Sequence, residues 1–405
     1  MKPILRAERM KPVHSDIRGP LFVEAMKRQK QGIDILKLNT GNPATFGFGL
    51  PDSIKNALMK HIQDGVGYCD FKGMPQARQA ICDYETSKGI KGITPDDVFI
   101  GNGVSEVVSF ALTPLLNDGD EVLVPSPSYS LWGNSVYLED GKPVFYTCDE
   151  KANWYPDIQD IRSKITDKTK AIVIINPNNP TGVLYPKELL LEIIQIAREF
   201  GLLIFADEIY DRLVMDGKQH ISLASLTEDV PVITLNGLSK SHCLCGYRCG
   251  WMVISGPREL TEDYRQGIIQ LTSLRLCANT MAQIVIPAAL DDMETPASMV
   301  RPGGRIYEQR EATVRELEKI DGLSFVKNDA AFYVFPKLDV KKFNITNDKQ
   351  FAHDLLDATN ILLVPGSGFD WKDPDHFRIV MLPQADILSD AIRRMGTFLD
   401  GYKQK

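Results

Sequence analysis

Polar side chains follow three apolar, β-branched runs in the middle of the chain. Asn179 comes just after the run in AIVIINPNNPTG, Asp207 and Tyr210 follow the run in LLIFADEIYD, and Ser239 and Lys240 follow the run in VITLNGLSK. In an open α/β sheet, ligands bind beyond the carboxyl ends of the strands. We therefore expect an amide, a carboxylate, a phenol and an amine to converge at one edge of one sheet, where a small molecule could bind.

A glycine-containing turn, GNGVSE, follows a fourth apolar run that ends at Ile100. The backbone amides of Gly103, Val104 and Ser105 would point from a helix N-terminus, which is a favourable place for a phosphate group. As a dinucleotide fingerprint the turn fails, because Glu106 stands where GxGxxG needs its third glycine. The sequence therefore predicts a phosphate site without a dinucleotide site.

A sheet is needed to position these residues, and the middle of the chain alternates β-branched runs with amphipathic segments. This pattern is typical of a mostly parallel sheet with helices on both faces. The expected strands span 98–100, 121–124, 143–147, 171–175, 202–206, 232–235 and 251–254, and the clearest helices span 106–116 and 187–200. The predicted fold class is α/β, with a mostly parallel seven-stranded sheet between helices.

The pattern changes after Pro302 to that of a smaller α+β domain. A long charged helix precedes short strands near Phe325 and at 332–335, 361–364 and 377–381, and a last helix at 385–399. Because chain termini often lie close together, residues 34–38 are expected to join this domain. The predicted domains are an N-terminal segment at 1–45 that joins the small domain, a large ligand-binding domain at 46–300 and the small C-terminal domain at 301–405.

The composition excludes several classes of protein. With 405 residues, a prior of about 150 residues per domain suggests two or three domains. Hydrophobic residues make up 43% and charged residues 24%, which excludes disorder, collagen and a fibrous rod. Apolar stretches fall far short of the ~20 residues that span a bilayer, and residues 1–16 lack the apolar core of a signal peptide. We expect a protein that stays inside the cell, with no membrane partner.

Charge and cysteine content further narrow the expected partners and location of the protein. A net charge of −7 argues against a nucleic-acid partner, because such domains usually present a basic face. Seven cysteines, an odd number without a secretion signal, indicate reduced thiols and a cytoplasmic location. His242, Cys243, Cys245 and Cys249 are close in SHCLCGYRCG, but their spacing does not match a tetrahedral metal site. No metal is expected.

Taken together, these motifs resemble those of class I aminotransferases, enzymes of the aspartate aminotransferase fold that use pyridoxal 5′-phosphate (PLP). The resemblance runs over nearly the whole chain and is most specific in the order NPNNPTG, DEIY, and SK followed after seven residues by RxG. Further matches are GNP at 41–43, GYCDFKG at 67–73, GNGVSE, PSYS and FRIVML. DIRGP at 16–20, GYCD and RLCAN at 275–279 are shared with the bacterial alanine aminotransferase group.

The resemblance implies how the large domain binds PLP. Lys240 would be linked to the cofactor aldehyde and, once released by the substrate amine, would move the proton of the substrate Cα. Asp207 would keep the pyridine nitrogen protonated, while Tyr210 and Asn179 would hydrogen-bond the ring hydroxyl. Tyr129 would stack on the ring.

The resemblance also indicates which residues bind the phosphate group of the cofactor. Its ligands would be Gly103, Val104, Ser105, Ser239 and Arg248. Tyr68 would reach the phosphate of the neighbouring subunit's cofactor, so the expected active unit is a homodimer with shared active sites.

A guanidinium can match an α-carboxylate with two hydrogen bonds. The resemblance gives this role to Arg378, with Gly41 and Asn179 completing the substrate pocket. Glutamate brings a second carboxylate, and our hypothesis is that Arg18, on a mobile N-terminal segment, binds it.

The resemblance therefore predicts an aminotransferase that works between L-alanine and 2-oxoglutarate by a ping-pong mechanism. Three alternatives stay open, because a fold does not fix a function: an aminotransferase for valine or aromatic amino acids, a C–S lyase, and a PLP-binding regulatory protein. The cysteines after Lys240 depart from the family pattern, and a thiol near Arg248 is expected to have an altered pKa.

Overall fold

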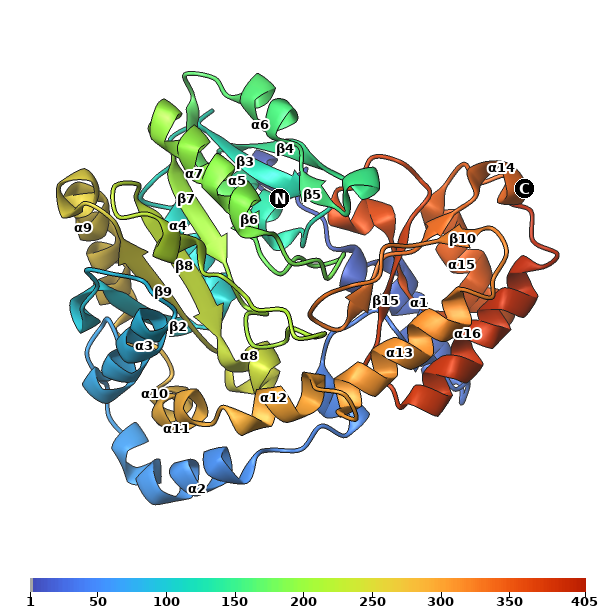
Figure 1. Ribbon diagram of the computed structural model, residues 1–405, viewed down its shortest axis with the longest axis horizontal. Coiled ribbons are helices and arrows are strands. Elements are labelled where there is room, and N and C mark those ends of the chain that lie inside the picture. The colour runs from blue at the N-terminus through green and yellow to red at the C-terminus, as the bar shows by residue number, and fades with distance from the viewer. Residues whose placement is uncertain (1–2) are drawn as a thin grey trace.

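The computed structural model describes residues 3–405. A large part is built around an eight-stranded sheet, and a smaller part combines C-terminal elements with the N-terminal helix α1 (Pro20–Lys30) (Figure 1). The strands of the large sheet lie in the order β2 (Val98–Asn102), β9 (Cys249–Ser255), β8 (Val232–Gly237), β7 (Leu203–Asp207), β6 (Thr169–Ile175), β3 (Glu121–Ser126), β4 (Lys142–Asp149) and β5 (Tyr155–Pro156).

The strand directions bring several loops to one edge of this sheet. Strands β4, β3, β6, β7 and β8 are parallel, whereas β9 is antiparallel to both of its neighbours, β8 and β2. As a result, β2 runs in the same direction as β8. The carboxyl ends of β2, β3, β6, β7 and β8 therefore meet at one edge, together with the start of β9.

The predicted α/β class is confirmed, and the sheet has one strand more than the seven expected. The additional strand, β5, is two residues long and pairs antiparallel with β4 at the sheet edge. Proline is tolerated at an edge because its missing N–H leaves no ladder position empty. A strand of this length carries no periodic pattern, so the sequence could not reveal it.

Helices cover both faces of the sheet. One face packs on α4 (Val104–Leu112), α5 (Leu131–Leu138) and α9 (Arg258–Arg275), and the other on α6 (Ile158–Lys164) and α7 (Lys187–Phe200). Helix α7 has the predicted bounds, because Pro186 precedes it and Gly201, with a φ of 66°, ends it. Helix α4 ends earlier than the predicted residue 116, because Pro114 has no N–H with which to continue the helix.

Short helices complete the large part around β2 and β9. They are α2 (Asp52–His61), α3 (Pro75–Ser87), α8 (Leu238–Ser241), α10 (Thr280–Gln283) and α11 (Ile286–Asp291), and α12 (Glu294–Val300) then leads away from them. None of the individual helices in residues 3–405 combines the length and the apolar composition of a membrane-spanning helix. Among residues 3–405, one helix pair, α9 with the segment Thr280–Asp291, has the length and apolar composition of a membrane span when taken together, and this pair is bent by 119°.

The smaller part has helices α13 (Arg305–Leu317), α14 (Val340–Phe343), α15 (Asp348–Thr359) and α16 (Ala385–Leu399). Its strands form three small sheets, namely β11 (Tyr333–Val334) with β15 (Phe377–Val380) and β14 (Val364–Pro365), β10 (Leu323–Ser324) with β12 (Lys337–Leu338), and β1 (Leu36–Lys37) with β13 (Ile361–Leu362). The strand expected at 361–364 is thus two strands with different partners. The β1–β13 pair joins the N-terminal segment to the C-terminal region as expected, while the domain boundaries stay a prediction.

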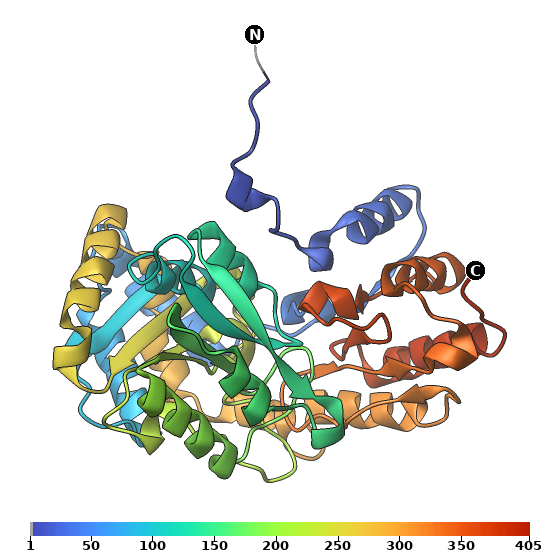
Figure 2. The ribbon, with the colours of Figure 1, turned by 90° about the horizontal axis from the view of Figure 1, so that it is seen from above.

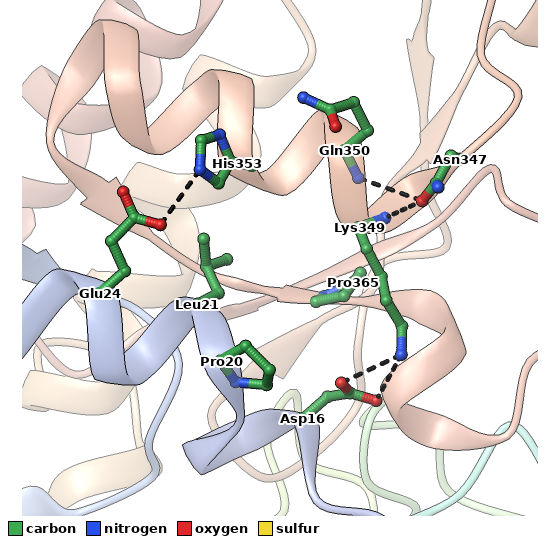
Figure 3. A pocket seen from close by; sticks show the side chains of 9 residues that line it. All are labelled: Asp16, Pro20, Leu21, Glu24, Asn347, Lys349, Gln350, His353 and Pro365. Carbon is green, nitrogen blue, oxygen red and sulfur yellow. Dashed lines mark hydrogen bonds and ion pairs between the residues drawn. The ribbon is translucent and has the colours of Figure 1, made fainter.

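Residues 3–19, before α1, cross from the large part to the smaller one, and the first of these described residues extend away from the body (Figure 2). His14 exchanges two hydrogen bonds with Asn134 of α5, through its N–H at 3.1 Å and its carbonyl at 2.6 Å. Two residues later, Asp16 pairs with Lys349 of α15 at 3.2 Å, and both residues line a surface pocket (Figure 3). The segment is therefore fastened to both parts.

Candidate active site

Three of the predicted residues lie at or just after the ends of neighbouring strands. Ile175 lies opposite Asp207 in the β6–β7 pair, and Asp207 lies opposite Leu235 in the β7–β8 pair. Because adjacent strands are about 4.8 Å apart, Asp207 at the end of β7 lies between the segments that follow β6 and β8, which carry Asn179 and Lys240.

Asp207 is a buried carboxyl group with two hydrogen-bond donors. Its Oδ2 accepts from Nε1 of Trp132 at 3.1 Å, and its Oδ1 accepts from the N–H of Ile209 at 3.3 Å. Burial raises the pKa of Asp207 to about 6, and these hydrogen bonds offset only part of that effect. A cation or protonated group at this position would restore the ionised form. Trp132 was not predicted; it lies in the first turn of α5, the helix that follows β3.

Tyr210 and Arg378 are linked through a third residue, Tyr333. The phenol oxygens of Tyr210 and Tyr333 are 3.0 Å apart, and the guanidinium carbon of Arg378 lies 4.6 Å from the centre of the Tyr333 ring. Burial keeps the pKa of Tyr210 well above its usual value, so its phenol is a hydrogen-bond donor. Tyr333 escaped sequence reasoning because it lies in a run of apolar residues that indicated only a strand.

Arg378, on β15, is 1% exposed, and its hydrogen bonds go to uncharged groups. Its Nη1 donates to Oδ1 of Asn179 at 2.9 Å, and its Nη2 donates to the carbonyl of Asn39. Within residues 3–405, its Nε has no partner and no carboxylate pairs with the guanidinium. Burial lowers the pKa of Arg378. A buried guanidinium in these surroundings favours binding of an anion.

Lys240, on the short helix α8, points to the same region. Its Nζ donates to the carbonyl of Gly41 at 2.9 Å and lies 4.0 Å from Sγ of Cys245. A side chain at Gly41 would collide with Tyr333, because a Cβ there would lie 2.3 Å from the phenol oxygen. The absence of a side chain at Gly41 thus lets Tyr333 approach the backbone segment that Lys240 contacts.

Arg248 lies directly before β9, near the end of β2. Its Nη1 donates to the carbonyl of Cys245 at 3.0 Å and its Nη2 to that of Asn102 at 3.3 Å. Gly103 has a φ of 85°, and a Cβ there would lie 2.3 Å from Nη2 of Arg248. Gly250 permits a second close approach, since a Cβ on it would lie 2.4 Å from the N–H nitrogen of Val104. These two glycines bring Arg248 to the N-terminus of α4.

One expectation about this turn needs correction. The N–H of Gly103 already donates to the carbonyl of Gly101 at 2.8 Å, so it is not directed at a phosphate. The amides of Val104 and Ser105, in the first turn of α4, have no helical acceptor and can still serve an anion. The role of Gly103 is to leave room for Arg248.

Three predicted residues are exposed: Tyr129 at 37%, Tyr68 at 83%, and Arg18 at the end of the short turn Asp16–Arg18. Arg18 follows a residue that is tied to the site. The carbonyl of Ile17 accepts from Nδ2 of Asn39 at 2.9 Å, and the carbonyl of Asn39 accepts from Arg378. The structure thus connects the N-terminal segment to Arg378.

The cysteines around Arg248 behave differently from one another. Burial raises the pKa of Cys243 and of Cys249 to about 12, so these thiols stay protonated and unreactive near neutral pH. The pKa values are altered, as expected, but in the direction that suppresses oxidation. Cys245 instead lies beside Lys240 and donates to the carbonyl of Ser239 at 2.9 Å.

With this geometry in place, comparison with known proteins assigns the family. The family model described as "Aminotransferase class I and II" matches residues 33–392. The chain belongs to this family. This aminotransferase is 50% identical, over 404 residues and the full length of both chains, to the glutamate-pyruvate aminotransferase AlaA of Haemophilus influenzae.

Solved structures agree over the same length. An aminotransferase from Escherichia coli is 47% identical, with a TM-score of 0.98 and full coverage of both chains. An alanine aminotransferase from Pyrococcus furiosus is 41% identical, with a TM-score of 0.92 and coverage of 98% of this chain and all of the other. The cofactor of this aminotransferase is PLP.

The site has the donors and acceptors that PLP requires. Asp207 offers a buried carboxyl group for a protonated ring nitrogen. Lys240 offers an amine, and the N-terminus of α4 with Arg248 offers amides and a guanidinium for the phosphate. The chemistry of the residues at this edge therefore fits the cofactor.

Proposed function

We propose that this aminotransferase transfers an amino group reversibly between L-alanine and 2-oxoglutarate, giving pyruvate and L-glutamate, by a ping-pong mechanism. The observation that carries the proposal is the anchoring of two groups to one short backbone segment. Lys240 donates to the carbonyl of Gly41, and Arg378 donates to that of Asn39. Two residues of chain span at most about 7 Å. An amine and a guanidinium that are held by two backbone carbonyls this close together suit the reacting Cα and the carboxylate of one amino acid.

PLP, when bound, supplies the aldehyde that takes up the amino group and the ring that accepts the electrons of the Cα–H bond. Lys240 would hold the cofactor through its amine and, once the substrate amine has freed it, would move the proton of the substrate Cα to the cofactor carbon that carried the aldehyde. Asp207 holds the proton on the ring nitrogen. Tyr210 donates to the ring hydroxyl, and its contact with Tyr333 orients the phenol.

The phosphate is held at the N-terminus of α4. The amides of Val104 and Ser105 and the guanidinium of Arg248 supply donors to the phosphate oxygens, and Ser239 adds its hydroxyl. Tyr129 covers the ring.

The substrate carboxylate binds to Arg378. Asn179 aligns the guanidinium through its Oδ1 at 2.9 Å, and its Nδ2 is available for the ring hydroxyl or the substrate. Gly41 completes this pocket through its backbone. Arg18 binds the second carboxylate of glutamate when the N-terminal segment lies over the site.

The active unit is a homodimer in which Tyr68 reaches the phosphate bound by the neighbouring subunit. Its side chain is 83% exposed, which suits a residue that acts on another chain. We assign the enzyme to the cytoplasm, an assignment supported by seven cysteines that are all free thiols.

A panel of amino donors tests the substrate assignment. Initial rates with 2-oxoglutarate are measured for alanine, valine, tyrosine and aspartate, and glutamate formation is followed in each case. Alanine is expected to give the highest kcat/KM. A preference for valine or tyrosine would keep the chemistry and change the substrate. Ammonia released together with pyruvate would indicate a lyase, and binding without turnover would indicate a regulatory protein.

A further inference from the structure

A buried group of charges lies behind the DEIY motif and has no part in the chemistry above. Nζ of Lys88, just after α3, pairs with Glu85 at 2.6 Å, with Glu208 at 2.8 Å and with Asp211 at 3.2 Å. The three carboxylate side chains are between 0% and 3% exposed. We call Lys88, Glu85, Glu208 and Asp211 the Lys88 cluster.

The sequence DEIYD contributes residues both to the active site and to the Lys88 cluster. Asp207 and Tyr210 belong to the active site, whereas Glu208 and Asp211 bind Lys88. One ammonium group therefore holds the residue after Asp207 and the residue after Tyr210. Any movement of these two carboxylates would move the two active-site side chains beside them.

Uncharged donors also form hydrogen bonds to the carboxylates of Glu208 and Asp211. Oε1 of Glu208 accepts from Oγ of Ser222 at 2.9 Å and from the N–H of Leu223 at 3.0 Å. Oδ2 of Asp211 accepts from the phenol of Tyr84 at 2.5 Å and from Nδ2 of Asn236 at 2.7 Å. The positions of the carboxylates are thus determined by α3, β8 and the loop before β8 together.

Lys88 is the cation that contacts all three carboxylates. Arg212 lies farther out, with its Nε donating to the phenol of Tyr84 at 3.1 Å. Burial lowers the pKa of His220, which lies 4.0 Å from Glu208, so this imidazole is neutral near pH 7. Burial also raises the pKa of Glu85, which favours a proton on that carboxyl group. Without Lys88, Glu208 and Asp211 would be left as buried anions, which is strongly destabilising.

The spacing of Glu208, Asp211 and His220 would also permit a metal ion to bind. Lys88 already pairs with both carboxylates at 2.8 and 3.2 Å. The cluster is therefore satisfied by an internal cation, and its geometry points to a positioning role.

We propose that Lys88 is a positioning residue of the transamination reaction, which holds Glu208 and Asp211 and thereby fixes Asp207 and Tyr210 against the cofactor ring. The catalytic part of this inference rests on the proposed function. Lys88 acts only through its neighbours, so substrate binding at Arg378 stays largely intact when it is removed. Displacement of catalytic groups by about 1 Å costs on the order of 100-fold in rate, which sets the scale of the expected effect.

The test compares Lys88→Met, Lys88→Arg and a control, Lys91→Met, as holoenzymes. Lys91 lies three residues further on and pairs with Glu228 at the surface, with 69% of its side chain exposed. For Lys88→Met, kcat with alanine is expected to fall between about 10- and 100-fold while KM changes less than about threefold. The pH midpoint of the visible absorption of bound PLP is expected to shift. Lys88→Arg should recover part of the wild-type kcat and part of the wild-type midpoint, and Lys91→Met should match wild type in both.

The absorption midpoint reports on the cofactor environment without any substrate. If wild type fails to use alanine, the proposed function fails, and the midpoint still tests Lys88. A Lys88→Met enzyme with a lower melting temperature but wild-type kcat per bound PLP and an unchanged midpoint would overturn the proposal. If Lys88→Met does not fold, Tyr84→Phe removes one hydrogen bond to Asp211 without changing the charge. An unchanged midpoint and kcat in Tyr84→Phe would then overturn it, and a smaller shift in both would support it.

Discussion

Oδ1 of Asn179 accepts a 2.9 Å hydrogen bond from Nη1 of Arg378, so an amide of the large part and a guanidinium of the smaller part form one unit. Asn179 follows β6, and Arg378 lies in the middle of β15. The unit spans the junction of the two parts of the molecule. A substrate carboxylate that binds to this guanidinium would therefore contact both parts at once.

Arg378→Lys tests the pairing of this unit with the substrate carboxylate. An ammonium group cannot reproduce the planar, two-donor geometry of a guanidinium. We expect kcat/KM for alanine to fall about 100-fold, mostly through KM, because a charged, two-fold hydrogen bond is lost. The control is Arg162→Lys, which alters an ion pair with Glu199 of 2.8 Å at the surface. An unchanged KM for alanine in Arg378→Lys would contradict the assignment.

Asp207→Asn tests the buried carboxyl group through the pH dependence of stability of the PLP-free protein. The pKa of Asp207 is raised to about 6, above the value of about 3.9 in an unfolded chain. Its contribution to stability is therefore complete below pH 4 and is lost as the pH rises through 6.

Relative to Asp207→Asn, the free energy of unfolding of wild type should fall by up to about 3 kcal/mol between pH 4 and pH 7. Chemical denaturation of both proteins over this range measures the difference. A difference that does not vary with pH would show that Asp207 is not buried with a raised pKa. In the same variant, PLP is expected to bind more weakly than in wild type.

Gly103→Ala tests the place of Arg248 at the N-terminus of α4. A methyl group there would lie 2.3 Å from Nη2 of Arg248 and would displace the guanidinium. Gly201→Ala is a matched control, because Gly201 also has a positive φ, of 66°, and no atom lies within 4 Å of an added Cβ. Both variants should lose some stability through the unfavourable φ. Only Gly103→Ala should weaken PLP binding, by about tenfold or more as measured by fluorescence titration. Equal PLP affinities for the two variants would contradict this account.

Arg18→Ala tests the second carboxylate site. Arg18 is exposed beside Ile17, which is linked through Asn39 to Arg378. We expect KM to rise about tenfold for glutamate and to change little for alanine, because only glutamate carries a side-chain carboxylate. Lys11→Ala, on the same segment, removes a surface charge and should leave both values unchanged. Equal effects of Arg18→Ala on both substrates would discard the role.

The residues at the strand ends were accessible from the sequence, because apolar runs identify parallel strands and the next polar residue lies at the sheet edge. Asp207 and Lys240 are of this kind. Tyr333 was not accessible, since it lies inside an apolar run and its role depends on the approach of β11 to Gly41. The direction of the Gly103 amide was wrong, because the tight turn to Gly101 depends on backbone angles that no residue pattern specifies.

In the smaller part, too, some features could not be predicted because they depend on tertiary packing. The pattern at 361–364 predicted one strand, but whether two-residue segments pair with β1 or β15 depends on tertiary packing. The Lys88 cluster could not be foreseen either. It joins Lys88 to residues more than 100 positions away, and in sequence each of its members resembles an ordinary surface charge.

The most direct test of the central claim is a single turnover with alanine in the absence of any 2-oxo acid. Purified wild-type holoenzyme is mixed with alanine, and pyruvate is quantified per subunit together with the change in cofactor absorption. We predict one equivalent of pyruvate per bound PLP, no ammonia, and full recovery of the original absorption when 2-oxoglutarate is added. Lys240→Ala should release no pyruvate and should lack the borohydride-reducible link to PLP. Continuous pyruvate release with ammonia, or no pyruvate from wild type, would contradict the account.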